Sequence, residues 1–284
     1  EINIILSHLI RNKGINMFKA NDMVVDITMG IVFLIGAFYG FLMFFDPSFT
    51  MTRYATGAEY DVGTITVFTI WLGMFNLGFI AGIIYMGYRG LDRAFFAYAI
   101  PLFILNLIWQ VPIAQDSGNY VGIVMVSVSL AALLIARSRS GFGSPFSIPK
   151  ADQMWGVSDN PTKVFLWLGL IGQSLNIIIF AVDPGNLINN TEFLVMSERA
   201  QHFSLVMPFL SVAWVITLLY QLRAGLSMTM VVVGTVISTI WFVLAINYLL
   251  ASGGTGGGNP LLAGTITLNF IGTWVIFLRN QANF

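Results

Sequence analysis

The chain alternates between long, almost uninterrupted apolar stretches and short polar segments. A helix that crosses a hydrocarbon layer of ~30 Å needs about 20 mostly apolar residues, and eight such stretches are bounded by charged or turn residues. Backbone groups in lipid must be satisfied within their own segment, and these runs lack the alternation of a membrane β-barrel, so the pattern predicts helices. The predicted spans are Ile27–Phe45, Thr66–Tyr88, Phe95–Ile113, Tyr120–Ala136, Val164–Val182, Phe203–Leu222, Met228–Leu250 and Leu261–Leu278.

Composition supports an all-α integral membrane protein. Of 284 residues, 57% are hydrophobic and 9% are charged, against roughly a quarter charged in a soluble domain, which excludes a soluble globular enzyme. The net charge is zero, so we expect contacts with membrane lipids and no nucleic-acid partner. With no cysteine and two histidines, a disulfide, a thiolate zinc site and an Fe–S cluster are excluded, and we predict neither a metal nor a cofactor.

The distribution of basic residues orients the predicted spans. All but two of the 13 Lys and Arg residues, Arg53 and Arg199, fall on one side of the membrane when the eight spans are threaded in order. Cytoplasmic loops carry the excess of Lys and Arg. We therefore expect a multi-pass protein with both termini on the cytoplasmic side, in a bacterial inner membrane.

The first 25 residues do not contain a span. The stretch Ile2–Lys19 mixes Ile, Leu and Phe with Arg11 and Lys13, and it is too short and too polar to cross a bilayer. A helix that lies in the membrane interface is the prediction for residues 1–25.

The two halves of the chain share landmarks, which indicates a duplication. The matched positions are Asp46 and Asp183, Asp61 and Glu198, and Gln110 and Asn247, each pair 137 residues apart. An even number of spans per half makes both halves enter the membrane from the same side, so the repeats are parallel. We predict four-helix repeats at 26–137 and 161–284, joined by a linker at 138–160.

Seven amide side chains fall inside the predicted spans. They are Asn76, Asn106, Gln110, Gln173, Asn176, Asn247 and Asn269. Amides in lipid either hydrogen-bond between helices or line a cavity, and the sequence leaves both roles open. No clear Asp, Glu, Lys, Arg or His lies in the middle of a span, which argues against a proton pump or an ion-coupled carrier.

Two GxxxG patterns predict close helix packing. Gly36 and Gly40 form the first pattern, and Gly78 and Gly82 form the second. Such glycines let backbones approach closely. Contact between the first two spans and contact with another subunit both remain possible.

Polar residues gather where the sixth span begins. Glu198, Arg199 and His202 lie within five residues of one another and could form an interfacial polar cluster. A single His does not suffice for a bound metal or haem. The cluster is the place where a lipid- or quinone-linked membrane enzyme would carry its chemistry, although no nucleophile accompanies it.

The segment Glu198-Arg199-Ala200 comes next after the span that ends in Asp183-Pro184. It opens the following span, which bears small residues of the Gly/Ser type. Here the chain resembles small four-helix bacterial membrane proteins of the DoxX-like type, which carry an acidic residue beside an Arg at this place. The first half departs from the pattern, since Glu59-Tyr60-Asp61-Val62 has no adjacent Arg. The resemblance implies a compact four-helix unit, here in tandem, associated with membrane redox or envelope functions. It carries no catalytic role to this chain.

Three functions follow from these observations. The first is a non-catalytic accessory or scaffold subunit that packs against other membrane subunits and contacts lipids or other hydrophobes. The second is a carrier for a small neutral or amphipathic solute at the interface of the repeats, which predicts a polar cavity lined by residues such as Asn106, Gln173 and Asn176. The third is an enzyme, which requires Glu198, Arg199 and His202 to converge beside an accessible pocket.

Overall fold

The structure is a computed structural model of the chain. It describes residues 18, 22–48, 61–142, 156–189, 194–251 and 260–283. This part of the chain is all-helical and contains no strand. The predicted interfacial helix lies outside the described residues apart from Phe18 and the start of the first long helix, and so does most of the linker at 138–160.

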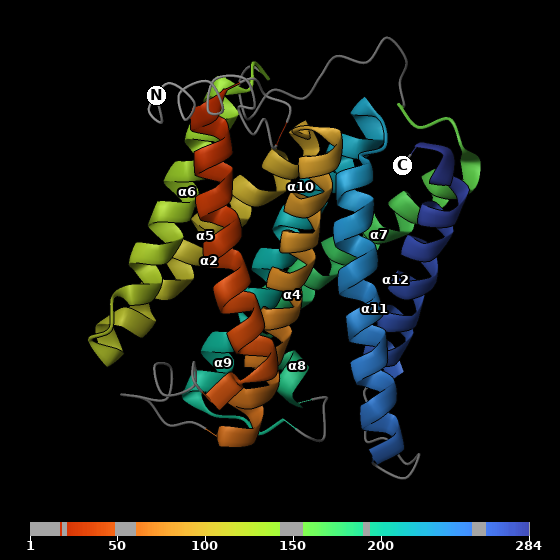
Figure 1. Cartoon of the computed structure of the whole chain (residues 1–284). Helices are drawn as coiled ribbons and strands as arrows, with labels where there is room; N and C mark the ends of the chain where they lie inside the picture. Colours follow the sequence, from red (N-terminus) through yellow and green to blue (C-terminus); the bar gives the residue numbers. More distant parts are fainter. Residues whose placement is uncertain are drawn as a thin grey trace, which may run out of the picture.

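The first half forms four long helices. They are α2 (Met23–Phe45), α4 (Val62–Arg89), α5 (Arg93–Ser117) and α6 (Val121–Arg139). Helix α2 packs against both α4 and α6, and α5 packs against α6. Figure 1 shows these helices running up and down through one side of the molecule.

The second half forms four long helices with the same order of contacts. They are α7 (Asn160–Val182), α10 (Val206–Ala224), α11 (Met228–Ala251) and α12 (Pro260–Arg279). Helix α7 packs against α10, and α11 packs against α12, but α7 and α12 meet less extensively than α2 and α6 do. Short helices complete this half: α8 (Asn186–Asn189), α9 (Glu198–Ser204) and the 3₁₀ turn η1 (Gln281–Asn283).

Seven helices are long and apolar enough to cross a membrane, so the prediction of an all-helical, multi-pass membrane protein is confirmed. The eighth predicted span corresponds to α12, whose described apolar part is the shorter segment Ala263–Arg279. The helix boundaries extend beyond the predicted spans by a few residues, because capping residues and charged ends add turns outside the apolar stretch.

One predicted span is interrupted. The sixth, Phe203–Leu222, is divided at Leu205 into α9 and α10. Pro208 lies three residues later, where it has no N–H for the carbonyl of Ser204 and its ring crowds that carbonyl. At the same break, the side-chain hydroxyl of Ser204 lies 2.7 Å from the carbonyls of Pro184 and Gln201 and donates to them.

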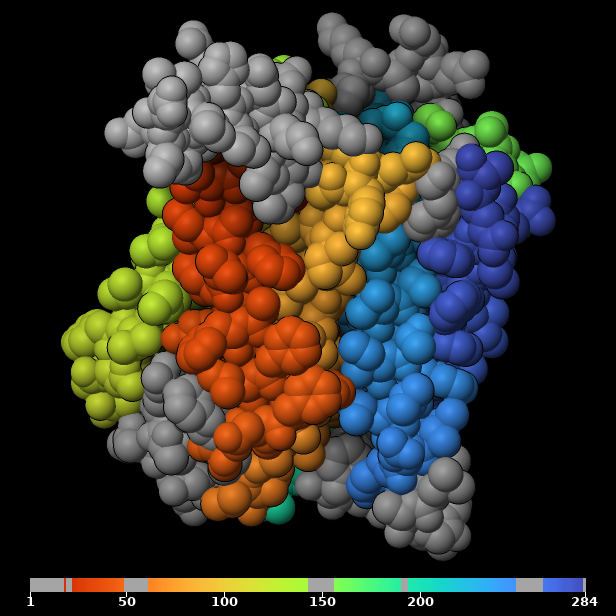
Figure 2. Space-filling view, in the orientation of Figure 1, coloured from red at the N-terminus to blue at the C-terminus, as the bar shows by residue number. Residues whose placement is uncertain are grey.

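The halves join chiefly through two helix pairs, α4 with α11 and α5 with α10. Gly78 and Gly82 lie where α11 presses on α4: a Cβ built on Gly82 would lie 2.6 Å from Val233 Cγ2, and one on Gly78 would overlap the side chain of Ile237. Gly36 and Gly40 instead face α4 within the first half. Figure 2 shows α2, α4, α11 and α12 side by side across one face.

Matching ion pairs tie the first helix of each half to the last. Asp22 caps α2 and receives a 2.7 Å hydrogen bond from Nε of Arg139 at the end of α6. Asp159 caps α7 and receives a 2.6 Å hydrogen bond from a terminal guanidinium nitrogen of Arg279 at the end of α12. The start of the first helix and the end of the fourth therefore lie together in both halves.

Two helix ends also match. Gly90 ends α4 with φ 102°, and Gly225 ends α10 with φ 111°. Positive φ of this kind favours glycine, which lacks the Cβ that would clash. Each of the two donates its N–H to the carbonyl four residues earlier, Met86 and Gln221 respectively.

Candidate functional site

The larger cavity lies within the second half of the molecule, among α7, α10, α11 and α12, with Phe75 of α4 at its edge. Its volume is about 190 Å³, somewhat more than the ~150 Å³ of a cavity that holds benzene in another protein. That is below the range of about 300–1,000 Å³ typical of pockets for drug-sized ligands. The cavity therefore suits a small molecule.

The cavity has a buried floor and a partly exposed mouth. Lining residues on α10 and α11 are buried, including Ser211 at 2% exposed and Ser238 at 4%. Lining residues on α7 and α12 include two exposed leucines, Leu168 at 40% and Leu268 at 47%. The opening therefore lies between α7 and α12, the helix pair that packs less extensively than α2 and α6.

Besides Gln221 of α10, whose side-chain oxygen accepts a hydrogen bond from the Ser227 N–H, three amides line this cavity: Gln173 and Asn176 from α7 and Asn269 from α12. Each is half-buried, and none of their side chains has a hydrogen-bond partner among the described residues. An amide offers two donors and an acceptor with two lone pairs, and leaving these unmade away from water is costly. The three side chains are therefore free to bind a molecule in the cavity.

The hydroxyl groups of the lining behave differently. The hydroxyl oxygens of Ser238 on α11 and Thr273 on α12 lie 2.6 Å apart and share a hydrogen bond. The Thr273 hydroxyl also donates to the backbone carbonyl of Asn269. These hydroxyls hold α11 to α12. Trp214 and Trp241 contribute flat apolar surface to the same cavity, and the ring of Trp214 packs 5.0 Å from that of Tyr98.

No charged side chain lines the cavity, and among the described residues no cluster of His, Cys, Asp or Glu could hold a metal ion. Its polar groups are amides, hydroxyls and indoles. Such a lining can recognise a neutral molecule by hydrogen bonds and enclose its apolar part.

Two other predicted amides line a separate, smaller cavity. Asn76 and Asn106 contribute to a space of about 60 Å³ between α4, α5 and α10, which is the interface of the halves. Asn76 donates a 2.9 Å hydrogen bond to the carbonyl of Leu72 within its own helix. This space is well below the ~150 Å³ of a cavity that holds benzene in another protein, so it suits buried water better than an organic ligand.

The remaining two predicted amides lie in neither cavity. Gln110 is buried at 7% exposed, and its side-chain oxygen lies 2.5 Å from where a Cβ on Gly122 would be, so Gly122 makes room for it. Asn247 is exposed on α11. The seven amides of the spans thus have four different environments, which depend on how the helices pack.

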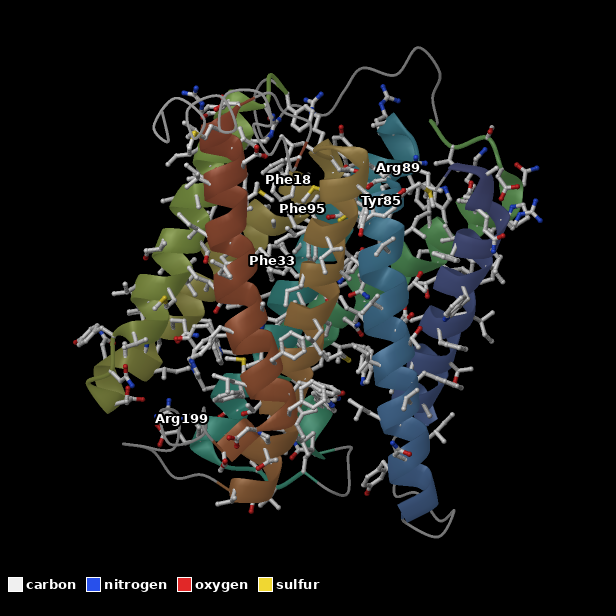
Figure 3. The ribbon with its side chains drawn as sticks, viewed as in Figure 1. Phe18, Phe33, Tyr85, Arg89, Phe95 and Arg199 are labelled. Carbon is white, nitrogen blue, oxygen red and sulfur yellow. The ribbon has the colours of Figure 1, made fainter. Side chains whose placement is uncertain are left out.

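Glu198, Arg199 and His202 line neither of these two cavities. Arg199 is 2% exposed and pairs with Asp116 at 3.2 Å, at the end of the molecule opposite Arg89 (Figure 3). His202 and Trp109 form a reciprocal contact, in which the indole N–H donates to the His202 carbonyl and the imidazole Nε2 lies 3.0 Å from the Trp109 carbonyl. Glu198 is exposed. The group ties α9 to α5 and presents no chemistry to either cavity.

Sequence reasoning missed the small residues that create the larger cavity. Gly169 and Gly172 share its lining with the α7 amides, and a Cβ built on Gly172 meets nothing within 4 Å. The signal was the spacing 169, 172, 173 and 176, which puts small and amide residues on one face of a helix. Thr265, Asn269, Gly272 and Thr273 repeat this pattern on α12.

Comparisons with protein-family models, with curated proteins and with solved structures find no match for this chain. The DoxX-like resemblance stays a prediction. The function proposed below rests on the geometry of the chain itself.

Proposed function

We propose that the chain is a non-catalytic integral membrane protein that binds a small, neutral, amphipathic molecule in the cavity among α7, α10, α11 and α12. One observation carries this proposal: three amides without hydrogen-bond partners, Gln173, Asn176 and Asn269, surround a cavity that has no charged lining. Polar groups at membrane depth are costly and usually serve a partner or a cavity. Here the cavity supplies the reason for them.

The proposed architecture is eight transmembrane helices in two parallel four-helix repeats. The matched caps and ion pairs of Asp22–Arg139 and Asp159–Arg279 and the matched contacts α4–α11 and α5–α10 support it. A twofold axis along the membrane normal exchanges each helix with its counterpart, as between the halves of some transporters. In this account α12 is the eighth span, and both termini lie on the cytoplasmic side of a bacterial inner membrane.

Native mass spectrometry of the protein, extracted mildly from its own membrane, tests the proposal. The wild type should retain a non-protein mass that a Gly172→Leu variant loses, because Gly172 lines the cavity and a Cβ there meets nothing within 4 Å, which leaves a leucine room to occupy the ligand's space. Gly30→Leu is the matched control, since a Cβ on Gly30 of α2 also meets nothing within 4 Å. Equal retention by all three proteins, or by none, would contradict the proposal.

A carrier for such a molecule is the second candidate, because the cavity opens on one flank between helices that pack less extensively than their counterparts. Uptake of the retained molecule into vesicles containing the protein would distinguish a carrier from a binding subunit. The role of accessory or scaffold subunit in a larger membrane complex stays a prediction. Stoichiometric co-purification of other subunits in the same mass spectra would support it.

A further inference from the structure

We infer that the ligand of the cavity places its hydrogen-bonding group against the amides of α7 and α12 and extends an apolar tail into the bilayer between these two helices. This inference rests on the proposed function and names the class of ligand. It distinguishes a membrane-dissolved molecule, such as a neutral lipid-like alcohol, carbonyl or amide compound, from a compact solute that reaches the cavity from water.

The asymmetry of burial around the cavity gives the direction. Ser211 and Ser238, on α10 and α11, are almost completely buried, while Leu168 and Leu268, on α7 and α12, are exposed. The exposed flank of a membrane-spanning helix faces lipid, so a molecule leaving the cavity between these leucines enters hydrocarbon. A charged or strongly hydrated solute has no route through that surface.

The two helices meet at one end and leave space further along. At the end where Asp159 pairs with Arg279, a Cβ on Gly272 of α12 would lie 2.9 Å from Phe165 of α7. About two turns along α7, a Cβ on Gly172 would meet nothing within 4 Å. In Figure 1, α7 runs obliquely whereas α12 stays nearly parallel to α11. The opening therefore lies along the middle of α7, beside Gln173 and Asn176.

Buried side chains occupy the corresponding region of the first half. The region enclosed by α2, α4, α5 and α6 is filled by buried side chains such as Met29, Val32 and Phe95, and α2 packs closely on α6. The two halves thus share a framework of caps and ion pairs, but the larger cavity belongs to the second. We assign ligand binding to the second half alone.

A matched set of benzyl compounds tests both the polarity and the direction. The probes are benzyl alcohol, toluene, benzoate and 4-octylbenzyl alcohol, offered to the full chain in phosphatidylcholine nanodiscs, with empty nanodiscs subtracted. A cavity of about 150 Å³ already holds benzene in another protein, so a benzyl group fits here. Benzyl alcohol should bind about three- to tenfold more tightly than toluene, because of its hydrogen bond, and benzoate should not bind.

The octyl compound decides the direction. If the cavity opens to the bilayer, 4-octylbenzyl alcohol binds at least as tightly as benzyl alcohol, and Gly172→Leu abolishes the binding of both while Gly30→Leu does not. Binding of benzyl alcohol with loss of the octyl compound would overturn the inference and leave the proposed function standing. Preference for benzoate or toluene would overturn the inference as to ligand class. If no probe binds and the native protein retains no small molecule, the proposed function fails as well.

Discussion

The hydroxyl of Ser227 donates a 2.7 Å hydrogen bond to a carboxylate oxygen of Asp92. Asp92 caps α5, where it also accepts from the backbone N–H of Ala94, and Ser227 accepts from the N–H of Met230 near the start of α11. The two residues begin corresponding helices of the two halves. Their contact therefore joins the halves at the ends of α5 and α11, close to the proposed twofold axis.

A double-mutant cycle measures this link. Asp92→Ala and Ser227→Ala should each lower the unfolding free energy by about 0.5–2 kcal/mol through loss of a helix cap. The double variant should lose about 1 kcal/mol less than the sum, because the two side chains interact directly. Thermal or denaturant unfolding in a mild detergent gives the four values. Strict additivity would show that the contact does not couple the halves.

The two matching ion pairs, Asp22–Arg139 and Asp159–Arg279, predict how stability depends on pH. Hydrogen bonds from Arg139 and Arg279 lower the pKa of Asp22 and Asp159 from the ordinary value of 3.8. A carboxylate whose pKa falls on folding stabilises the fold above its unfolded pKa, and the stabilisation is lost as pH falls through the folded pKa. The melting temperature should therefore hold from neutral pH to about pH 5 and fall below about pH 4.

Asp22→Asn combined with Asp159→Asn should lower the melting temperature at neutral pH and reduce the further fall in acid. Glu198→Gln is the control, since this exposed carboxylate has no ion-pair partner among the described residues. An acid profile unchanged in the double variant would mean that other carboxylates control the acid sensitivity. The pairs are exposed, so raising the salt concentration should weaken their effect.

The glycines of α4 predict a second test of how the halves join. Gly78→Ala should destabilise the fold by about 1–3 kcal/mol, because the added methyl overlaps Ile237 in a packed interface. Adding Ile237→Ala should recover part of that loss by removing the overlapping atoms. Gly30→Ala should be neutral or stabilising, since its Cβ points into open space. Unfolding measurements on the wild type and these three variants check this, and a destabilising effect of Gly30→Ala equal to that of Gly78→Ala would contradict the account.

The proposed topology is testable because the chain contains no cysteine. Single cysteines at Ser140, after α6, and at Asn119, between α5 and α6, lie at opposite ends of one span. A membrane-impermeant maleimide should label Ser140→Cys only from the cytoplasmic side and Asn119→Cys only from the other. Labelling of both from the same side would refute the span between them, and a reversed pattern would refute the orientation.

The spans were predictable from the sequence, because a segment that crosses lipid needs a continuous apolar stretch and must satisfy its own backbone hydrogen bonds as a helix. The break at Leu205 was less visible, since a proline in a membrane helix can kink, interrupt or be tolerated. The pairing of Asp22 with Arg139 could not be read from the sequence. It joins residues 117 positions apart and depends on which helices become neighbours.

The candidate site illustrates the same limit. Gln173, Asn176 and Asn269 were identified as costly polar residues within spans, yet so was Gln110, which is buried beside Gly122. Only the arrangement of helices separates the amides that line a cavity from those that pack. The sequence could not predict the empty space beside Gly172 either. Glycine occurs both where helices pack closely, as at Gly82, and beside open space, as at Gly172.

An experimental density map of the protein, extracted mildly from its own membrane, tests the central claim most directly. The account predicts density for a small molecule between α7 and α12, with a polar atom within hydrogen-bond distance of at least two of Gln173, Asn176 and Asn269. A cavity without such density, in which the three amides hydrogen-bond to one another or to neighbouring helices, would contradict it.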